Sequence, residues 1–399
     1  MKPFNTKFLS IVAIQLVGIV MASNLAASLG SLILRVATQS SDGDRSAKAE
    51  AVASEVNAYE QAASDYPSFQ AFKRDLAKLP DYPFRSFSGW RSAAFSSPSI
   101  NINREGVRAT PVLLPVNSGL AVWMLGGSTV WGYGVSDRET MPAYFQGYSG
   151  FRTLNLGEQA FTSRQSLNLL LNELVRARLN GSLPRLVIAY EGVNDTLYPC
   201  TTPSDQPFVH DREREIQQAL VAAKHAIGLR RALQATVLAV AGSTYRSLFP
   251  AVYGFQQQLL GTKTDRGGKG NVDASAKRCS SDGYARSVAF NLVQNWESAH
   301  HLLAAQGIRF YAFLQPTPSN DPAYKGRVVS DFTYYYSRIF PLVRAYAKDK
   351  PWFVDGSSWF VRYGQPAWLD PCCHANPMAN RYIARNVIRE LQARGALPR

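Results

Sequence analysis

The feature that most constrains this chain is a repeated alternation of short apolar stretches with longer segments of helical period. Residues 120–125, 151–156, 186–190, 308–314 and 352–355 predict strands, and residues 136–145, 163–179, 287–306, 331–348 and 376–393 predict helices. Strands and helices that alternate at this spacing form right-handed βαβ units and a parallel sheet. We therefore expect an α/β protein with three α/β/α layers and a parallel sheet of about five strands.

A long insertion interrupts the alternation at residues 196–285. It contains an amphipathic piece at 212–235, an apolar run at 237–241 and a glycine-rich loop at 261–270, and basic residues outnumber acidic ones. The apolar run is too short to cross a membrane. The insertion is therefore interpreted as a helical lid over the sheet, with contact to a membrane surface as the alternative.

The N-terminal region, residues 1–35, predicts a transmembrane anchor. Lys2 and Lys7 precede residues 8–34, which carry no charge and exceed the roughly 20 residues that a spanning helix needs. A cleaved signal peptide is the alternative, because small residues at 20–22 suit a cleavage point. With the lysines before the run, we expect a membrane-anchored protein whose bulk is extracytoplasmic, on the periplasmic side of the inner membrane.

Residues 36–116 are interpreted as a stalk and lead-in segment that precedes the main domain at 117–399. Residues 46–79 have a helix-like composition, and proline interrupts it at residues 80 and 83. Residues 84–116 show no clear period, and we expect loops with short extended pieces that pack on the sheet.

The charge of the chain favours an anionic partner. Lys and Arg total 43 against 29 Asp and Glu, a formal net charge of +14, which suits an acidic polymer, phospholipid headgroups or nucleic acid. No zinc-finger spacing, RNP-type aromatic strand or dense basic run is present, so we expect no nucleic-acid partner. We also expect no cofactor and no metal, because paired Cys and His ligand spacings are absent.

Four cysteines agree with export to an oxidising compartment. Cys200 and Cys279 lie near the two ends of the insertion, whereas Cys372 and Cys373 are adjacent. They predict one or two disulfides, with free buried thiols as the alternative, and the sequence does not give the connectivity.

Polar and glycine residues follow several predicted strands. Ser128 follows the first strand after two glycines, Gly157 follows the second, Asn194 follows the third, and Asp370 and His374 lie in a later loop. Carboxyl ends of parallel strands meet at one edge of a sheet, so we expect these residues to lie together. They supply the parts for acyl transfer: a nucleophile, a base, an acid that orients the base, and oxyanion donors.

Four ordered blocks resemble the SGNH branch of the GDSL esterase/lipase superfamily. They are residues 126–129 (Gly-Gly-Ser-Thr), 155–157 (Asn-Leu-Gly), 192–195 (Gly-Val-Asn-Asp) and 370–374. The resemblance implies a flavodoxin-like fold and a serine-dependent esterase. It also implies Ser128 as nucleophile, His374 as base, Asp370 as acid, and the Ser128 amide, the Gly157 amide and the Asn194 carboxamide as oxyanion donors.

The last block departs from the family pattern. Asp370 lies four residues before His374, whereas the family places the acid three residues before the base. A bulge would absorb the extra residue, or a backbone carbonyl would orient His374 instead.

The expected function is an exported serine esterase or O-acyltransferase, acting most simply on acetyl groups of an acylated or anionic cell-surface polysaccharide. Aromatic residues that could stack on sugars include Trp131, Tyr133, Trp296 and Tyr334 to Tyr336, although such residues are more often in cores. A lipid or small-ester substrate is the first alternative. The second is a non-catalytic scaffold of the same fold that binds envelope proteins.

Overall fold

The computed structural model describes residues 66–111, 117–201, 206–208, 210, 212–213, 215–216, 278–324 and 330–398. The compact unit treated below is formed by Val52–Arg214 and Asp273–Arg399. The predicted anchor, residues 36–65 of the predicted stalk and most of the predicted insertion lie outside the described residues. Among the helices that are described, none is both long enough and apolar enough to span a membrane.

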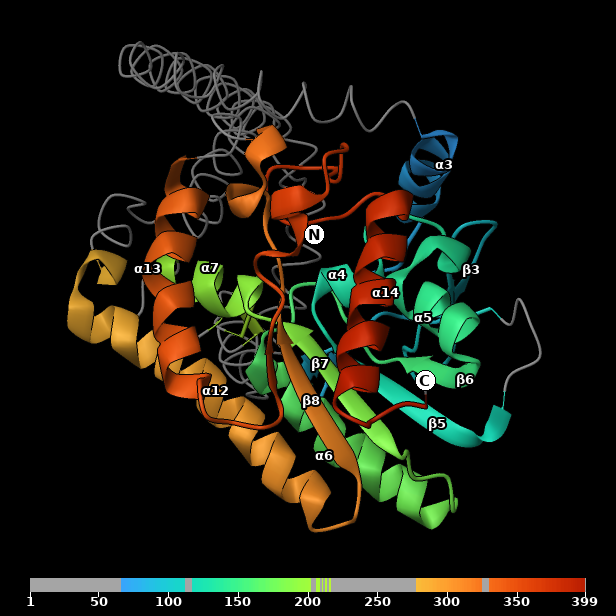
Figure 1. Cartoon of the computed structure of the whole chain (residues 1–399). Helices are drawn as coiled ribbons and strands as arrows, with labels where there is room; N and C mark the ends of the chain where they lie inside the picture. The colour runs from blue at the N-terminus through green and yellow to red at the C-terminus, as the bar shows by residue number, and fades with distance from the viewer. Residues whose placement is uncertain are drawn as a thin grey trace, which may run out of the picture. The chain divides into compact units, whose positions relative to one another are not determined.

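A five-stranded parallel sheet forms the centre of the unit (Figure 1). Its strands, in spatial order, are β6 (Phe151–Asn155), β5 (Asn117–Gly126), β7 (Leu186–Glu191), β8 (Arg309–Leu314) and β9 (Phe353–Asp355). Every residue of β7 is buried, as expected for a central parallel strand covered on both faces. The predicted parallel sheet is confirmed, and each predicted strand is present.

Helices cover both faces of the sheet and complete the predicted three layers (Figure 1). Helices α5 (Met141–Ser149) and α14 (Pro377–Ala393) pack against each other on one side. On the other side, α6 (Ser163–Leu179) and α13 (Ser330–Ala347) both pack against α12 (Asp282–Ala304). Under α5 and α14 the core contains Val122, Met124, Ile188, Phe313, Ile383 and Val387.

Two details of the predicted helices were wrong. The helix predicted at 136–145 begins at Met141, because Thr140 caps its first turn by accepting the Ala143 amide at 3.2 Å. Residues Asp137–Glu139 form a separate 3-10 turn. Helix α6 has the predicted bounds, and of the leucines whose helical spacing predicted its buried face, Leu170 and Leu174 are buried, whereas Leu171 and Leu179 are 44% and 82% exposed.

The described part of the lead-in segment contains α3 (Pro67–Leu76), within the stretch of helix-like composition, and four two-residue strands, which are short extended pieces of the kind predicted for residues 84–116. The strands are β1 (Phe84–Arg85), β2 (Gly89–Trp90), β3 (Phe95–Ser96) and β4 (Asn101–Ile102). Phe72 and Ile100 from this segment form a buried cluster with Trp131. The lead-in residues therefore pack directly beside the loop that follows β5.

The cysteines are paired within the described residues. Helix α7 (Val193–Thr201) follows β7, and its Cys200 is bonded to Cys279, which precedes α12, with 5.4 Å between the two Cα atoms. The adjacent Cys372 and Cys373 form the second disulfide. The expectation of disulfides is confirmed, and no free cysteine remains.

Candidate active site

Ser128 lies directly beyond the carboxyl end of β5, as the first residue of the short helix α4 (Ser128–Trp131). Two glycines make this sharp turn possible. A Cβ on Gly126 would lie 2.5 Å from the Tyr190 carbonyl oxygen, and one on Gly127 would lie 2.5 Å from Asn194 Nδ2. Any larger residue at either position would push the strand end away from its neighbours, so the turn requires glycine.

His374 joins Ser128 to Asp370. Its Nε2 lies 2.8 Å from Ser128 Oγ, and its Nδ1 is hydrogen-bonded to the Asp370 carboxylate. The ring also packs on Tyr133, with 4.5 Å between the ring centroids. The three residues singled out in the sequence therefore form one continuous hydrogen-bonded line, although His374 lies 246 positions from Ser128.

The unusual spacing of Asp370 and His374 has a local explanation. Asp370 Oδ1 accepts the amides of Cys372 at 3.0 Å, Cys373 at 3.0 Å and His374 at 3.2 Å, and Oδ2 remains for the imidazole. The loop closes around one carboxylate oxygen, so the extra residue does not separate acid from base. Burial tends to raise the pKa of Asp370, but His374 and these amide donors lower it below its ordinary value.

The residues expected to supply oxyanion donors lie at or close to the turn that carries Ser128, but the donors differ in their present hydrogen-bond partners. Asn194 Nδ2 donates one hydrogen to the Phe161 carbonyl at 2.8 Å, which fixes the carboxamide and leaves its second hydrogen for another acceptor. The Ser128 amide is at a helix start, where backbone donors lack intrahelical partners. The Gly157 amide donates to Asn155 Oδ1 at 3.1 Å, so it is already engaged.

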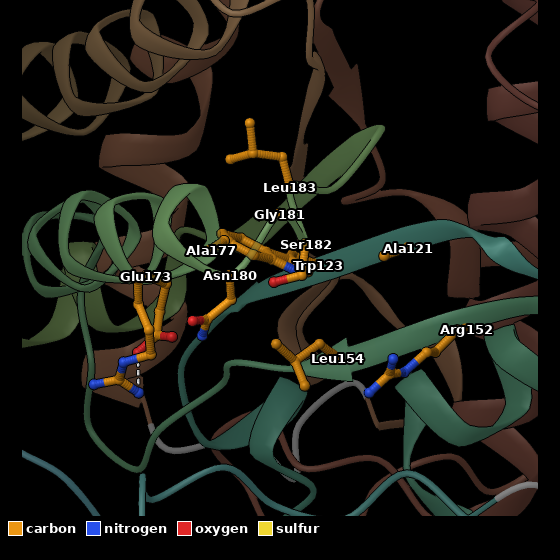
Figure 2. A pocket seen from close by; sticks show the side chains of 11 residues that line it. Ala121, Trp123, Arg152, Leu154, Glu173, Ala177, Asn180, Gly181, Ser182 and Leu183 are labelled. Carbon is orange, nitrogen blue, oxygen red and sulfur yellow. Dashed lines mark ion pairs between the residues drawn. The ribbon is translucent and has the colours of Figure 1, made fainter.

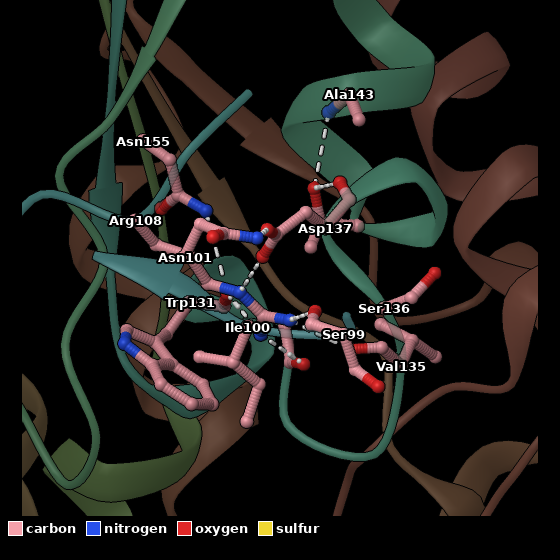
Figure 3. A network of polar contacts seen from close by, with 12 residues as sticks. Ser99, Ile100, Asn101, Arg108, Trp131, Val135, Ser136, Asp137, Ala143 and Asn155 are labelled. Carbon is pink, nitrogen blue, oxygen red and sulfur yellow. Dashed lines mark hydrogen bonds and ion pairs between the residues drawn. The ribbon is translucent and has the colours of Figure 1, made fainter. Parts of the chain in front are cut away.

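A buried arginine that was not predicted from the sequence holds the turn that carries Ser128 (Figure 3). Arg108 is fully buried, and its Nε donates to Asp137 Oδ1 at 2.7 Å. Its guanidinium carbon lies 4.4 Å from the Trp131 ring centroid. Its remaining donors reach four carbonyl oxygens, those of Ser99, Trp131, Gly132 and Val135, at 2.6–3.2 Å. Arg108 thus fixes the backbone immediately after Ser128.

Residues 156–161, here called the strap, connect Gly157 to Phe161. Glu158 in the strap accepts the Ser92 amide at 2.6 Å and lies 3.7 Å from Arg91. Burial raises the pKa of Glu158, and the charge of Arg91 opposes this rise. The strap contains Gly157, and its Phe161 carbonyl accepts from Asn194. Arg91 and Ser92 therefore help to position two of the expected oxyanion donors through Glu158.

His210 reaches the strap from the insertion. Its Nδ1 accepts the Arg212 amide at 3.0 Å, so Nε2 carries the hydrogen and donates it to the Ala160 carbonyl at 2.9 Å. Burial lowers the pKa of His210 to about 4, which keeps the ring neutral. Single histidines carry no sequence signal for such a role, and this residue was not predicted.

Two buried carboxyl groups, those of Glu191 and Asp195, lie on either side of Asn194 in the sequence. Glu191 accepts the Trp296 indole N–H at 2.7 Å, and Asp195 accepts the Ser163 amide at 2.9 Å. Burial, and then the charge of Asp195, raises the pKa of Glu191. A carboxyl group held neutral in this way stabilises the turn between β7 and α7 without placing two charges in the core.

Most of the aromatic residues that were expected to stack on sugars do not lie on the surface. Trp131, Trp296, Tyr335 and Tyr336 are buried and cannot stack on a sugar, so only Tyr133 and the exposed Tyr334 remain from that prediction.

A hollow of about 460 Å³ lies between α6, β5 and β6 but includes none of the three residues Ser128, His374 and Asp370 (Figure 2). Within the described chain, no group of His, Cys, Asp and Glu could hold a metal ion.

Comparison with known proteins finds resemblance only among solved structures. No protein-family model and no curated protein matches the chain. A lipolytic protein of the G-D-S-L family from Veillonella parvula DSM 2008 is 12% identical, covers 68% of this chain and 97% of its own, and gives a TM-score of 0.38. The acetyl xylan esterase AlAXEase is 13% identical over 68% of this chain and 100% of its own, with a TM-score of 0.36. A catalytic mutant of an acetylxylan esterase from Geobacillus stearothermophilus is 14% identical, covers 70% of this chain and 96% of its own, and gives a TM-score of 0.33.

Proposed function

We propose that this chain is a serine esterase or O-acyltransferase of the SGNH type, with Ser128, His374 and Asp370 as its catalytic triad. The observation that carries the proposal is the hydrogen bonding of His374 to Ser128 Oγ on one side and to Asp370 on the other. A serine hydroxyl becomes nucleophilic only beside a base, and that base needs a partner to hold its tautomer and orientation. Ser128 is the hydroxyl, His374 is the base beside it, and Asp370 is the partner of that base.

In this mechanism His374 Nε2 takes the Ser128 proton while Oγ attacks the ester carbonyl carbon. The lowered pKa of Asp370 keeps that group ionised, so it stabilises the imidazolium that forms. The Ser128 amide and the second Asn194 hydrogen stabilise the oxyanion, each worth about 2.7–4 kcal/mol in comparable sites. His374 then returns the proton to the leaving alkoxide. Water completes a hydrolysis, and a sugar hydroxyl completes a transfer.

The proposed substrate is an acyl ester, most simply an acetyl ester, on an anionic or acylated polysaccharide outside the cytoplasm. The formal charge of +14 supports an anionic polymer. The uncharged run at residues 8–34 supports an anchored, extracytoplasmic location on the periplasmic side of the inner membrane. Partner proteins of the cell envelope belong to the same proposal.

One observation favours a second candidate, a non-catalytic scaffold. The Gly157 amide is bound to Asn155 Oδ1 at 3.1 Å, so one expected oxyanion donor is not available as it stands. A scaffold would retain the fold without needing that donor.

The deciding experiment is the intact mass of the full chain after treatment with a fluorophosphonate serine probe. Labelling of one serine that disappears in Ser128→Ala and falls strongly in His374→Ala supports the triad. Ser319→Ala, which changes an exposed hydroxyl near α13, serves as the matched control and should label normally. A folded chain that stays unlabelled and turns over no acetyl ester would refute the esterase and favour the scaffold.

A further inference from the structure

Arg212 lies at the start of the insertion and is tied to the strap. Its amide donates to His210 Nδ1, and His210 in turn donates to the Ala160 carbonyl. Its guanidinium carbon lies 4.6 Å from the ring centroid of Tyr82 and 5.3 Å from that of Trp90. The cation is therefore held against two aromatic rings at a defined position beside the strap.

No carboxylate among the described residues neutralises this cation. Glu158 is bound to Ser92 and pairs with Arg91 at 3.7 Å. Glu213 pairs with Arg164 at 3.5 Å and also accepts from a glutamine. In addition, Nη1 of Arg212 is buried without a hydrogen-bond partner in this part of the chain. Unsatisfied buried donors are rare in folded proteins and call for an explanation.

A row of aromatic side chains leads from this arginine to the proposed reaction centre. Arg212 lies over Tyr82, and Tyr82 is close enough to Tyr133 for the two phenols to interact electrostatically. Tyr133 packs on the His374 ring at 4.5 Å. Burial and the charge of Glu158 raise the pKa of Tyr82, so its hydroxyl stays protonated and can donate a hydrogen bond.

We propose that Arg212, together with the Tyr82 hydroxyl, forms a subsite that binds a carboxylate of the substrate beside the ester under attack. The substrate class is then an O-acylated uronic acid unit, since this sugar carries a carboxylate close to its acylated hydroxyls. The planar guanidinium suits a carboxylate because it can donate two parallel hydrogen bonds. This inference rests on the proposed esterase function and narrows its substrate.

The test compares two substrates that differ only at C6, O-acetylglucuronic acid and O-acetylglucose. The wild-type full chain should prefer the acetylglucuronate by about tenfold or more in kcat/KM, through KM, as one charge-assisted interaction allows. Arg212→Gln should remove the preference. Arg212→Lys should retain part of it, because lysine keeps the positive charge but cannot donate two parallel hydrogen bonds to a carboxylate. Arg178→Gln, which alters an exposed arginine on α6, should keep the wild-type ratio.

A binding experiment separates this proposal from the esterase proposal. Calorimetry measures unacetylated triglucuronate binding to wild type and Arg212→Gln, and it needs no turnover. Binding that depends on Arg212 without any ester turnover would uphold the subsite and overturn the esterase. Turnover with equal kcat/KM for both esters in wild type would overturn the subsite and uphold the esterase. Tighter binding of a sugar phosphate than of triglucuronate would overturn the carboxylate assignment.

Discussion

Replacing Arg108 by methionine should strongly destabilise the domain. Methionine fills a similar volume but leaves Asp137 buried at 5% exposure without its ion-pair partner, and four carbonyl oxygens without their donor. Breaking a buried ion pair in this way costs about 3–5 kcal/mol. That loss is a large part of the 5–15 kcal/mol that typically stabilises a domain.

Urea unfolding of the full chain, followed by tryptophan fluorescence, would measure this loss as a shift in midpoint. The double variant Arg108→Met/Asp137→Leu should lose less than the sum of its two single variants, because it removes both charges together. Arg178→Met is the matched control and should change the free energy of unfolding by less than about 0.5 kcal/mol. A loss below about 1 kcal/mol for Arg108→Met would refute the structural role assigned to this residue.

Three further predictions concern the core and the site. Glu191 has its pKa raised to about 8 from 4.5, so the folded state holds this proton more tightly than the unfolded state and stability should fall as pH rises from about 4.5 to 8. Glu191→Gln should flatten that part of the curve in urea unfolding, and an unchanged slope would contradict the assignment. Replacing Cys200 and Cys279 with alanine opens a loop with a sequence separation of 79, which should cost up to about 4.5 kcal/mol, and a fully stable double variant would argue against the bridge. Gly127→Ala would displace Asn194, whose Nδ2 lies 2.5 Å from the new Cβ, and should lower kcat on an acetyl ester by roughly tenfold or more if that side chain stabilises the oxyanion.

The sequence predicted those parts of the fold and site whose signals are local. Apolar runs identified all five strands of the central sheet, and a serine or asparagine directly after a strand marked the edge where both lie. Ser128 and His374 were therefore expected to meet before any distance was known. The start of α5 was predicted five residues too early because residues 137–139 form a separate 3-10 turn and Thr140 caps the helix after it.

Residues whose role depends on distant partners could not be predicted. Arg108 and Asp137 are 29 positions apart, and Ser92 and Glu158 are 66 apart. A single arginine in an irregular segment usually lies on the surface, and only the packed structure shows that Arg108 is enclosed. The Asp370 loop is a similar case, since three amides converging on one oxygen leave no mark in the residue spacing.

The Cys200–Cys279 bridge has a consequence for how proteins of this architecture can diversify. The disulfide holds the Cα atoms of the two cysteines 5.4 Å apart, at the points where the chain leaves the sheet domain and returns to it. A segment of almost any length can begin and end at these two points without distorting the sheet or its helices. Exchanging this segment between proteins would then replace Arg212 and its neighbours, and so change what is recognised, while the Ser128 turn stays in place.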